Sequence, residues 1–196
     1  MNSFSAKLFK YRSYMPIPFV LVMLFYHNSN IWSMAVGLFI ALVGEYIRLM
    51  GVSWAGSETR TTGTVGGTYL IISGPFGHLR NPLYFGNILM YFGFGIMSNA
   101  LFPYLQFAGL IFFSLQYHFI VKEEENYLRS TYGKDYEEYV KNVPRFFPRL
   151  TRYRNEKVAQ PPFNLKAGFK SERRTLQAFS IITLTLFLLW FFRRLS

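Results

Sequence analysis

The sequence predicts an all-α fold, a polytopic bundle of about five transmembrane helices that forms a single domain over residues 1–196. Hydrophobic residues make up 51% of the chain and charged residues only 16%, and the 22 Phe and 14 Tyr exceed what the core of a soluble domain of this size needs. The apolar residues are also gathered in blocks that hold few charges, at residues 13–27, 31–50, 83–98, 100–121 and 176–192.

The lengths of these blocks suit membrane helices, because about 20 apolar residues in a helix cross the ~30 Å hydrocarbon layer. Blocks 31–50 and 100–121 are long enough, whereas 13–27 is short. Runs such as VLVMLFY and LIFFSLQY lack the alternation of apolar and polar residues that membrane β-strands show. The pattern therefore favours helices, with a surface linker at 149–175 and a last helix at 176–192 that either crosses the bilayer or lies on it.

Three basic residues, Lys7, Lys10 and Arg12, precede the first apolar block, as in a secretory signal. No small-residue cleavage site follows that block, and four more apolar blocks come after it, so we expect an uncleaved first helix. The chain contains no cysteine, which excludes disulfides and thiol-ligated metals. We expect no metal site.

The distribution of basic residues predicts the topology. Loops 27–30 and 98–103 contain no Lys or Arg, whereas the N-terminus and the segments 51–82 and 122–175 contain most of them. By the positive-inside rule we expect the basic segments to lie in the cytosol. The absence of cysteine and the short termini favour a bacterial inner membrane. The net charge of +11 then suits contact with anionic lipid headgroups, and we expect no nucleic-acid partner.

The second apolar block carries two charges near its cytosolic end. Glu45 and Arg48 lie about one helical turn apart, and a charge inside the hydrocarbon layer costs free energy unless it is paired. They form either an ion pair along the helix that reaches the surface or a polar floor for a headgroup or cofactor. Because intramembrane charges commonly mark functional sites, both are candidate site residues.

The segment GPFGHLRNPLYFGN, residues 74–87, precedes and opens the third apolar block. Pro75 and Pro82 keep the residues before them out of the helical conformation, and Pro82 suits the first turn of a helix. Arg80 and Asn81 then stand at a helix N-terminus, where the helix dipole favours anions. The segment is a candidate binding loop, although Arg80 could equally anchor a lipid phosphate.

The fourth apolar block ends in three consecutive acids, Glu123, Glu124 and Glu125. Acids near a helix C-terminus oppose the helix dipole, so they require a cationic partner. That partner is either a local basic side chain, such as Lys122, or a cationic ligand, and we favour the ligand.

The segment 132–148, YGKDYEEYVKNVPRFFP, has the spacing of an amphipathic helix closed by prolines. Its tyrosines at helical spacing predict packing against the rest of the protein. Arg145 lies between aromatic residues and prolines, where its guanidinium could bind a carboxylate or phosphate.

Three segments, GPFGHLRNPLYFGN, EEENYL and YGKDYEEYVKNVPRFFP, follow in this order around two apolar blocks. In them the sequence resembles the isoprenylcysteine carboxyl methyltransferase and phospholipid N-methyltransferase superfamily of membrane methyltransferases, over about residues 40–150. The resemblance implies a helical membrane fold that binds S-adenosylmethionine at its cytosolic face. Isoprenylcysteine members carry His where this chain has Asn81, so the sequence is more similar to phospholipid-type and uncharacterised bacterial members.

The resemblance also implies roles for single residues. Glu124 and Glu125 would meet the ammonium group of S-adenosylmethionine, and Arg145 would bind its carboxylate or close the pocket. One wall of the cofactor site would be formed by Arg80, Asn81, Pro82 and Tyr84.

These observations predict methyl transfer from S-adenosylmethionine to an amphiphilic acceptor in the membrane, a lipid or a lipidated molecule. The cofactor brings the reactivity, and the protein supplies alignment and electrostatics. An amine acceptor would need a base, for which His78 and Glu45 are candidates, with Arg48 beside Glu45. The alternatives are an NADPH-dependent membrane sterol or steroid reductase, which shares a similar proline-tyrosine segment, and a non-catalytic lipid-binding protein.

Overall fold

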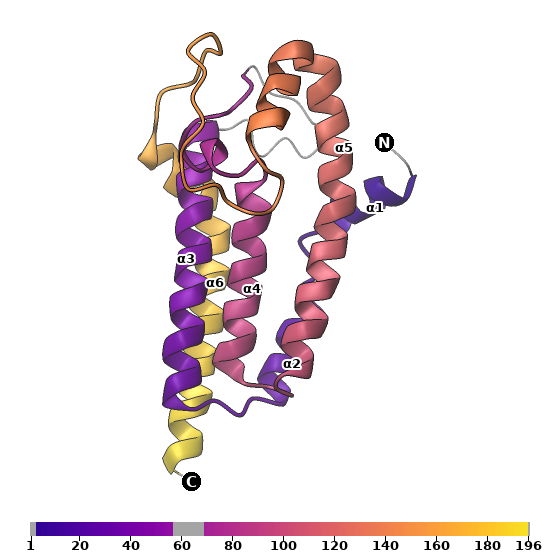
Figure 1. Ribbon diagram of the computed structural model, residues 1–196. Coiled ribbons are helices and arrows are strands. Elements are labelled where there is room, and N and C mark those ends of the chain that lie inside the picture. Colours follow the sequence, from indigo (N-terminus) through magenta and orange to yellow (C-terminus); the bar gives the residue numbers. More distant parts are fainter. Residues whose placement is uncertain (1–2, 57–68, 196) are drawn as a thin grey trace.

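The computed structural model describes residues 3–56 and 69–195 and shows helices running along one long axis (Figure 1). Two short helices, α1 (Ser3–Tyr11) and α2 (Ile17–Phe25), and a 3-10 turn, η2 (Gly74–Gly77), accompany the long helices. The long helices are α3 (Ile31–Ala55), α4 (Pro82–Ser98), α5 (Tyr104–Asn142) and α6 (Leu165–Leu195). Those described ranges contain no β-strand, and the predicted all-α membrane bundle is confirmed.

Three helices, α3, α5 and α6, are long and apolar enough to cross a membrane, as judged over the described residues. Helix α4 has 17 residues, about 25 Å, and is slightly shorter than the hydrocarbon layer. The first apolar block forms only the nine-residue helix α2. Pro16 caps α2 and Pro18 lies in its first turn, and because proline lacks an N–H, the helix starts here instead of extending back along the block.

Helix α6 is longer than the expected last span. It begins at Leu165, inside the segment expected to be a surface linker over 149–175. The side-chain oxygen of Asn164 accepts a hydrogen bond from the Ala167 N–H at 2.9 Å, which caps the helix start. Only the stretch before Asn164 is therefore a connection, and the basic residues after it belong to α6.

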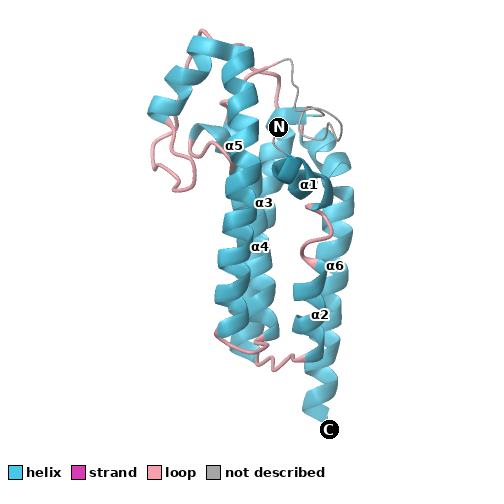
Figure 2. Cartoon of the chain, turned by 90° about the vertical axis from the view of Figure 1, so that its right-hand side faces the viewer, coloured by secondary structure: helices cyan, strands magenta, loops and turns pink. Residues whose placement is uncertain are grey.

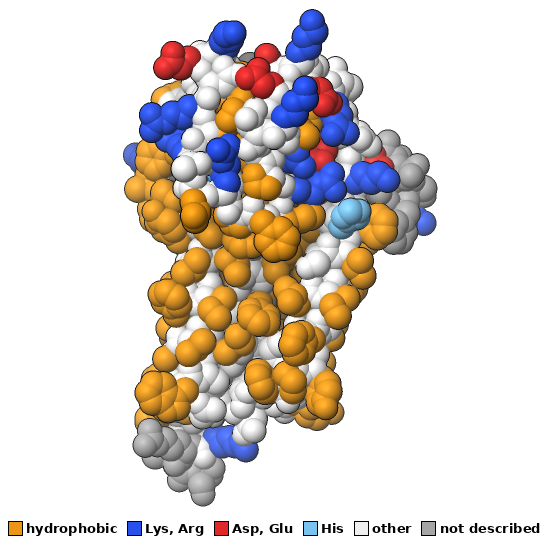
Figure 3. All heavy atoms as spheres, viewed as in Figure 1, with side chains coloured by type: hydrophobic (Ala, Val, Ile, Leu, Met, Phe, Trp, Pro, Cys, Tyr) orange, Lys and Arg blue, Asp and Glu red, His pale blue; other side chains and the backbone are white. Residues whose placement is uncertain are grey.

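The two ends of the molecule differ in charge. The α2–α3 and α4–α5 loops lie together at one end, with the C-terminus (Figure 1). Lys, Arg, Asp and Glu gather at the opposite end, while hydrophobic side chains cover the body between the ends (Figure 3). We call the end where these charged side chains gather the charged end. It holds the segments expected to share one face of the membrane, and which compartment it faces stays a prediction.

Helices α3 and α4 pack with their backbones almost touching. A Cβ on Gly44 would lie 2.6 Å from the carbonyl oxygen of Gly86, and a Cβ on Gly93 would lie 2.5 Å from the backbone nitrogen of Ala41. Small residues that let membrane helices approach closely are typical of helix–helix contacts in lipid. Helix α6 approaches α3 in the same way, with Gly168 against the side chain of Ser53.

Helix α5 bends sharply near the charged end. Gly133 has φ of 49°, which a residue with a Cβ rarely adopts, and the chain beyond it folds back over the bundle (Figure 2). In the folded-back part, Tyr136 and Tyr139 are buried against Leu70 and Ile72. The packing role predicted for these tyrosines is confirmed.

Candidate functional site

The candidate site lies where the segment before α4 meets the segment after α5. The Arg80 N–H donates to the carbonyl oxygen of Pro144 at 3.0 Å, and the Tyr153 N–H donates to that of Gly77 at 2.8 Å. The Tyr139 hydroxyl also donates to the Phe76 carbonyl oxygen at 2.8 Å. The two polar segments expected to share one face therefore bind each other directly.

An ionic cluster of Arg80, Glu125 and Arg145, which we call the outer cluster, occupies this junction. Glu125 is only 2% exposed, and both of its carboxylate oxygens bind the Arg145 guanidinium, one of them from Nε at 3.1 Å. Arg80 Nε lies 3.3 Å from the same carboxylate, and Arg80 Nη1 donates to the Val140 carbonyl oxygen at 3.2 Å. Paired contacts of this kind fix both partners in orientation as well as in distance.

Glu124 points to a different partner. It accepts a hydrogen bond from the Tyr84 hydroxyl at 2.6 Å. The ring of Tyr84 lies against that of Tyr117, with centroids 4.7 Å apart, and the Tyr117 hydroxyl accepts a hydrogen bond from the Asn87 amide at 3.1 Å. The acids at the end of the fourth apolar block therefore join polar groups on α4.

Asn81 and Pro82 form the start of α4. Pro82 is buried at the first helical position, and the Asn81 carbonyl oxygen accepts the first helical hydrogen bond, from Phe85 at 3.1 Å. The Asn81 side chain does not cap the helix, and its buried amide nitrogen lacks a hydrogen-bond acceptor among the described residues. The hydrogen-bonding capacity of this N–H group is therefore unused among the described residues.

A second group of polar side chains lies around Asn87, about one helical turn beyond Tyr84 along α4. We call Glu45, Arg48, Asn87 and Glu172 the inner cluster. Arg48 Nη1 donates to the side-chain oxygen of Asn87, and Nη2 lies 2.6 Å from a carboxylate oxygen of Glu172 on α6. The group ties α3 to α4 and to α6.

The ion pair expected between Glu45 and Arg48 is present, but it does not reach the surface. Arg48 turns inward to α4 and α6 instead of reaching the surface, and its distance to Glu45 is 3.6 Å, from Nε to the carboxylate. The polar floor for a headgroup or cofactor stays a prediction. The ion pair along the helix is not the main contact of Arg48. It is secondary to the pair with Glu172, because α6 brings a closer carboxylate.

His78 lies apart from both clusters. Its Nδ1 is 2.9 Å from the Arg149 carbonyl oxygen, and the Arg149 N–H donates to the His78 carbonyl oxygen at 3.0 Å. Because a carbonyl can only accept, Nδ1 carries a proton, which leaves Nε2 as the nitrogen that could act as a base. The residue joins the segments on either side of the site.

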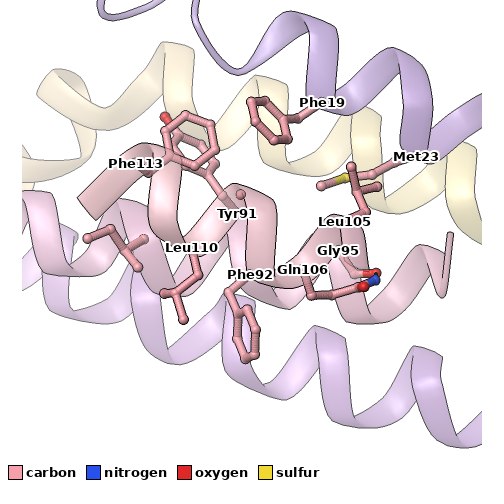
Figure 4. Close-up of a pocket in the computed structure, with 11 residues that line it drawn as sticks. Phe19, Met23, Tyr91, Phe92, Gly95, Leu105, Gln106, Leu110 and Phe113 are labelled. Carbon is pink, nitrogen blue, oxygen red and sulfur yellow. Dashed lines mark hydrogen bonds between the residues drawn. The ribbon is translucent and has the colours of Figure 1, made fainter. Parts of the chain in front are cut away.

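A small cavity lies between α2, α4 and α5, and no residue of the outer or inner cluster lines it. It is enclosed by α2, α4 and α5, with Phe19, Tyr91, Gly95 and Gln106 among its walls (Figure 4). Its volume of about 10 Å³ has room for about one water molecule.

The structure adds three residues that the sequence did not single out, Tyr117, Glu172 and Thr175. Thr175 lies 3.4 Å from Arg48 Nη2. Of these three, Glu172 could have been recognised from the sequence, because it is the one acid in the basic stretch KSERR, which precedes an apolar block. Such a lone acid needs a partner on another helix once the helix is buried.

The chain belongs to the phospholipid methyltransferase family. The family model matches residues 32–135, which comprise nearly all of α3, the whole of α4 and α5 as far as its folded-back part. The superfamily expected from the sequence is confirmed. Arg145 and Glu172 both lie outside the matched segment.

Two bacterial proteins resemble the chain. It is 31% identical over 143 residues to the cobalt-zinc-cadmium resistance protein CzcN of Cupriavidus metallidurans, covering 71% of this chain and 63% of that protein. It is 26% identical over 128 residues to the nickel-cobalt-cadmium resistance protein NccN of Alcaligenes xylosoxydans xylosoxydans, covering 65% of this chain and 57% of that protein. Both matches span less than two thirds of the relative's length.

A shorter similarity joins the chain to an enzyme of another class. Over 94 residues it is 36% identical to the delta(14)-sterol reductase TM7SF2 of Mus musculus, covering 47% of this chain and 21% of that protein. No solved structure gives a significant match. Within residues 3–56 and 69–195, no group of three or more His, Cys, Asp and Glu side chains is placed to hold a metal ion.

Proposed function

We propose that this chain is an S-adenosylmethionine-dependent methyltransferase that acts on a lipid or lipid-like acceptor in the membrane. The observation that carries the proposal is the outer cluster, where Glu125 binds Arg80 and Arg145, together with the adjacent Glu124, which accepts a hydrogen bond from Tyr84. Membership of the phospholipid methyltransferase family supports the reaction class.

The charges at this junction fit the amino-acid part of S-adenosylmethionine. Its ammonium group would bind Glu124 and Glu125, and its carboxylate would bind Arg145, with the free amide N–H of Asn81 as a further donor. When bound, S-adenosylmethionine supplies an electrophilic methyl group on its sulfonium sulfur.

The residues of the outer cluster would share the work of binding. Arg145 could turn from Glu125 to the ligand carboxylate, because Arg80 would still pair with Glu125 at 3.3 Å. Tyr84 holds Glu124 in place through its hydroxyl, and the neighbouring rings of Tyr84 and Tyr117, tilted by 36° to each other, offer faces that attract a cation.

The acceptor would reach the site from the bilayer, beside the apolar body of the protein (Figure 3). The inner cluster, one turn deeper in α4, is where its polar group would bind. For an amine acceptor, Glu45 is our candidate for the proton acceptor, and Nε2 of His78 is the second candidate.

The proposal is tested by the thermal stability of the purified protein in mild detergent with S-adenosylhomocysteine or with NADPH. A ligand present at 100 times its dissociation constant stabilises the native state by ~2.7 kcal/mol, which is readily measured. We expect stabilisation by S-adenosylhomocysteine and none by NADPH. Stabilisation by NADPH alone would place the chain with the reductases, the class favoured by the sterol reductase match.

Variants locate the binding site. Glu124→Gln and Arg145→Gln should each weaken S-adenosylhomocysteine binding about tenfold or more, since hydrogen bonds to charged groups contribute ~1.5–3 kcal/mol. Glu156→Gln removes an exposed acid from the α5–α6 connection and serves as the control with unchanged affinity. Affinity that is unchanged in both site variants would refute the outer cluster as the cofactor site.

A further inference from the structure

Glu172 is the most deeply buried acid of the inner cluster, with 1% of its surface exposed. It lies on α6, beyond the segment that the family model matches. Its carboxylate contacts Arg48 Nη2 at 2.6 Å, while Nη1 of the same guanidinium is bound by Asn87. Two of the three nitrogens of the Arg48 guanidinium are therefore held by α6 and α4.

Glu45 receives none of these contacts. It is 5% exposed, and neither of its carboxylate oxygens has a hydrogen-bond partner within the described part of the chain. Arg48 Nε, at 3.6 Å, is too far for a hydrogen bond. Glu45 and Arg48 are spaced for a direct pair on one helix face, so their separation requires a stronger partner that holds the guanidinium elsewhere.

The path of the Arg48 side chain depends on Gly86. A Cβ on Gly86 would lie 2.6 Å from Arg48 Cγ, so a larger residue on α4 would block the side chain from crossing to α6. The absence of a side chain at this position and the carboxylate of Glu172 together direct the guanidinium away from Glu45. One guanidinium thus faces two carboxylates, and Glu172 is the one that it binds.

We propose that Glu172 is a positioning residue of the acceptor site, which holds Arg48 and so keeps the Glu45 carboxylate free to accept a hydrogen bond from the acceptor. This inference rests on the proposed function, because the ligand of Glu45 is the methyl acceptor. A buried carboxylate without donors gains most from a group that supplies them. The acceptor is therefore one whose polar group carries an N–H or O–H.

The state of Glu45 can be measured without knowing the acceptor. Dicyclohexylcarbodiimide is an apolar reagent that adds to carboxyl groups in apolar surroundings when no cation shields them. We would treat the full chain in detergent with it and quantify the adduct on the peptide containing Glu45 by mass spectrometry. The Glu45→Gln variant, which cannot form this adduct, identifies the signal.

We expect Glu45 to be labelled in the wild type and labelling to fall about tenfold in Glu172→Gln, a change that corresponds to ~1.4 kcal/mol. Without Glu172, Arg48 is free to pair with Glu45. Glu156→Gln, which removes an exposed acid, should label as the wild type does. Glu172→Asp keeps the charge and should retain most of the labelling.

A double variant tests whether the effect acts through Arg48. In Arg48→Gln/Glu172→Gln the competing cation is gone, so labelling of Glu45 should return to the wild-type level. The proposal is overturned if wild-type Glu45 is not labelled, if Glu172→Gln labels as the wild type does, or if the double variant stays unlabelled. None of these measurements needs S-adenosylmethionine, so their failure is distinct from a failure of the cofactor-binding test.

Discussion

The outer and inner clusters combine acids and arginines in opposite ratios. In the outer cluster two guanidiniums, from Arg80 and Arg145, bind the single carboxylate of Glu125. In the inner cluster one guanidinium, from Arg48, faces the carboxylates of Glu45 and Glu172. The outer acid is therefore fully paired, whereas the inner cluster leaves one buried carboxylate without a hydrogen bond among the described residues.

The opposite ratios determine which side chains each cluster can release to a ligand. The outer cluster can release one arginine to an anionic group and still keep Glu125 paired, which suits a ligand that carries both signs of charge. The inner cluster cannot release its arginine to a ligand, because Arg48 links three helices. It can only add a donor at Glu45. Removing an arginine should therefore have different consequences in the two places.

The largest effect is expected for Arg48→Ala. It removes the cation that both Glu45 and Glu172 contact, and breaking a buried ion pair in this way costs ~3–5 kcal/mol. Arg145→Ala should cost less, since Arg80 still pairs with Glu125. Thermal unfolding in detergent would measure both variants, with Arg173→Ala, which removes an exposed arginine of α6, as the control. Equal losses of stability in the Arg48 and Arg145 variants would contradict the difference between the two clusters.

A second expected effect concerns Gly86, the residue of α4 that makes room for the Arg48 side chain on its way to α6. In Gly86→Ala the new Cβ would lie 2.6 Å from both the Gly44 carbonyl oxygen and Arg48 Cγ, and overpacking of this kind costs ~1–3 kcal/mol. Gly109→Ala meets only Phe19 at 3.7 Å, an ordinary contact, and should gain up to ~1 kcal/mol in helix propensity. The two variants should therefore shift the unfolding temperature in opposite directions, and shifts of the same sign would contradict the close α3–α4 contact.

The smallest effect is expected at the support of the outer cluster. Tyr139→Phe removes the hydrogen bond to the Phe76 carbonyl oxygen, worth about 1 kcal/mol in stability. It should weaken S-adenosylhomocysteine binding less than Arg145→Gln does, because it loosens the segment before α4 without removing a charge. Tyr46→Phe, at a side chain 63% exposed, is the matched control and should change neither stability nor binding.

The sequence predicted those helices whose bounds follow from the pattern of apolar residues. Block 83–98 became α4 almost residue for residue, and the amphipathic spacing of 132–148 correctly marked a helix that packs through its tyrosines. The first and last blocks were less well predicted. Local chemistry, namely the proline-rich start of α2 and the Asn164 cap of α6, sets those boundaries, and hydropathy does not detect it.

The site was predicted in its parts but not in its pairings. The sequence indicated that the acids at 123–125 needed a cation, and that Arg145 would bind a carboxylate. It did not predict that Arg145 binds Glu125 itself, because this contact depends on the reversal of the chain at Gly133. The pairing of Arg48 with Glu172 could not be predicted from the sequence either, since helix packing brings together residues that are 124 positions apart.

That separation in sequence also has a consequence during synthesis. Arg48 is made before Glu172, and at ~5–20 residues per second the 124 positions that separate them take roughly 6–25 s to translate. Throughout that interval α3 carries its arginine without the partner from α6. Glu45, three positions earlier on the same helix, is available from the start. Glu45, whose carboxylate has no hydrogen bond among the described residues of the finished protein, is thus the acid that can neutralise Arg48 while the membrane bundle is still being assembled.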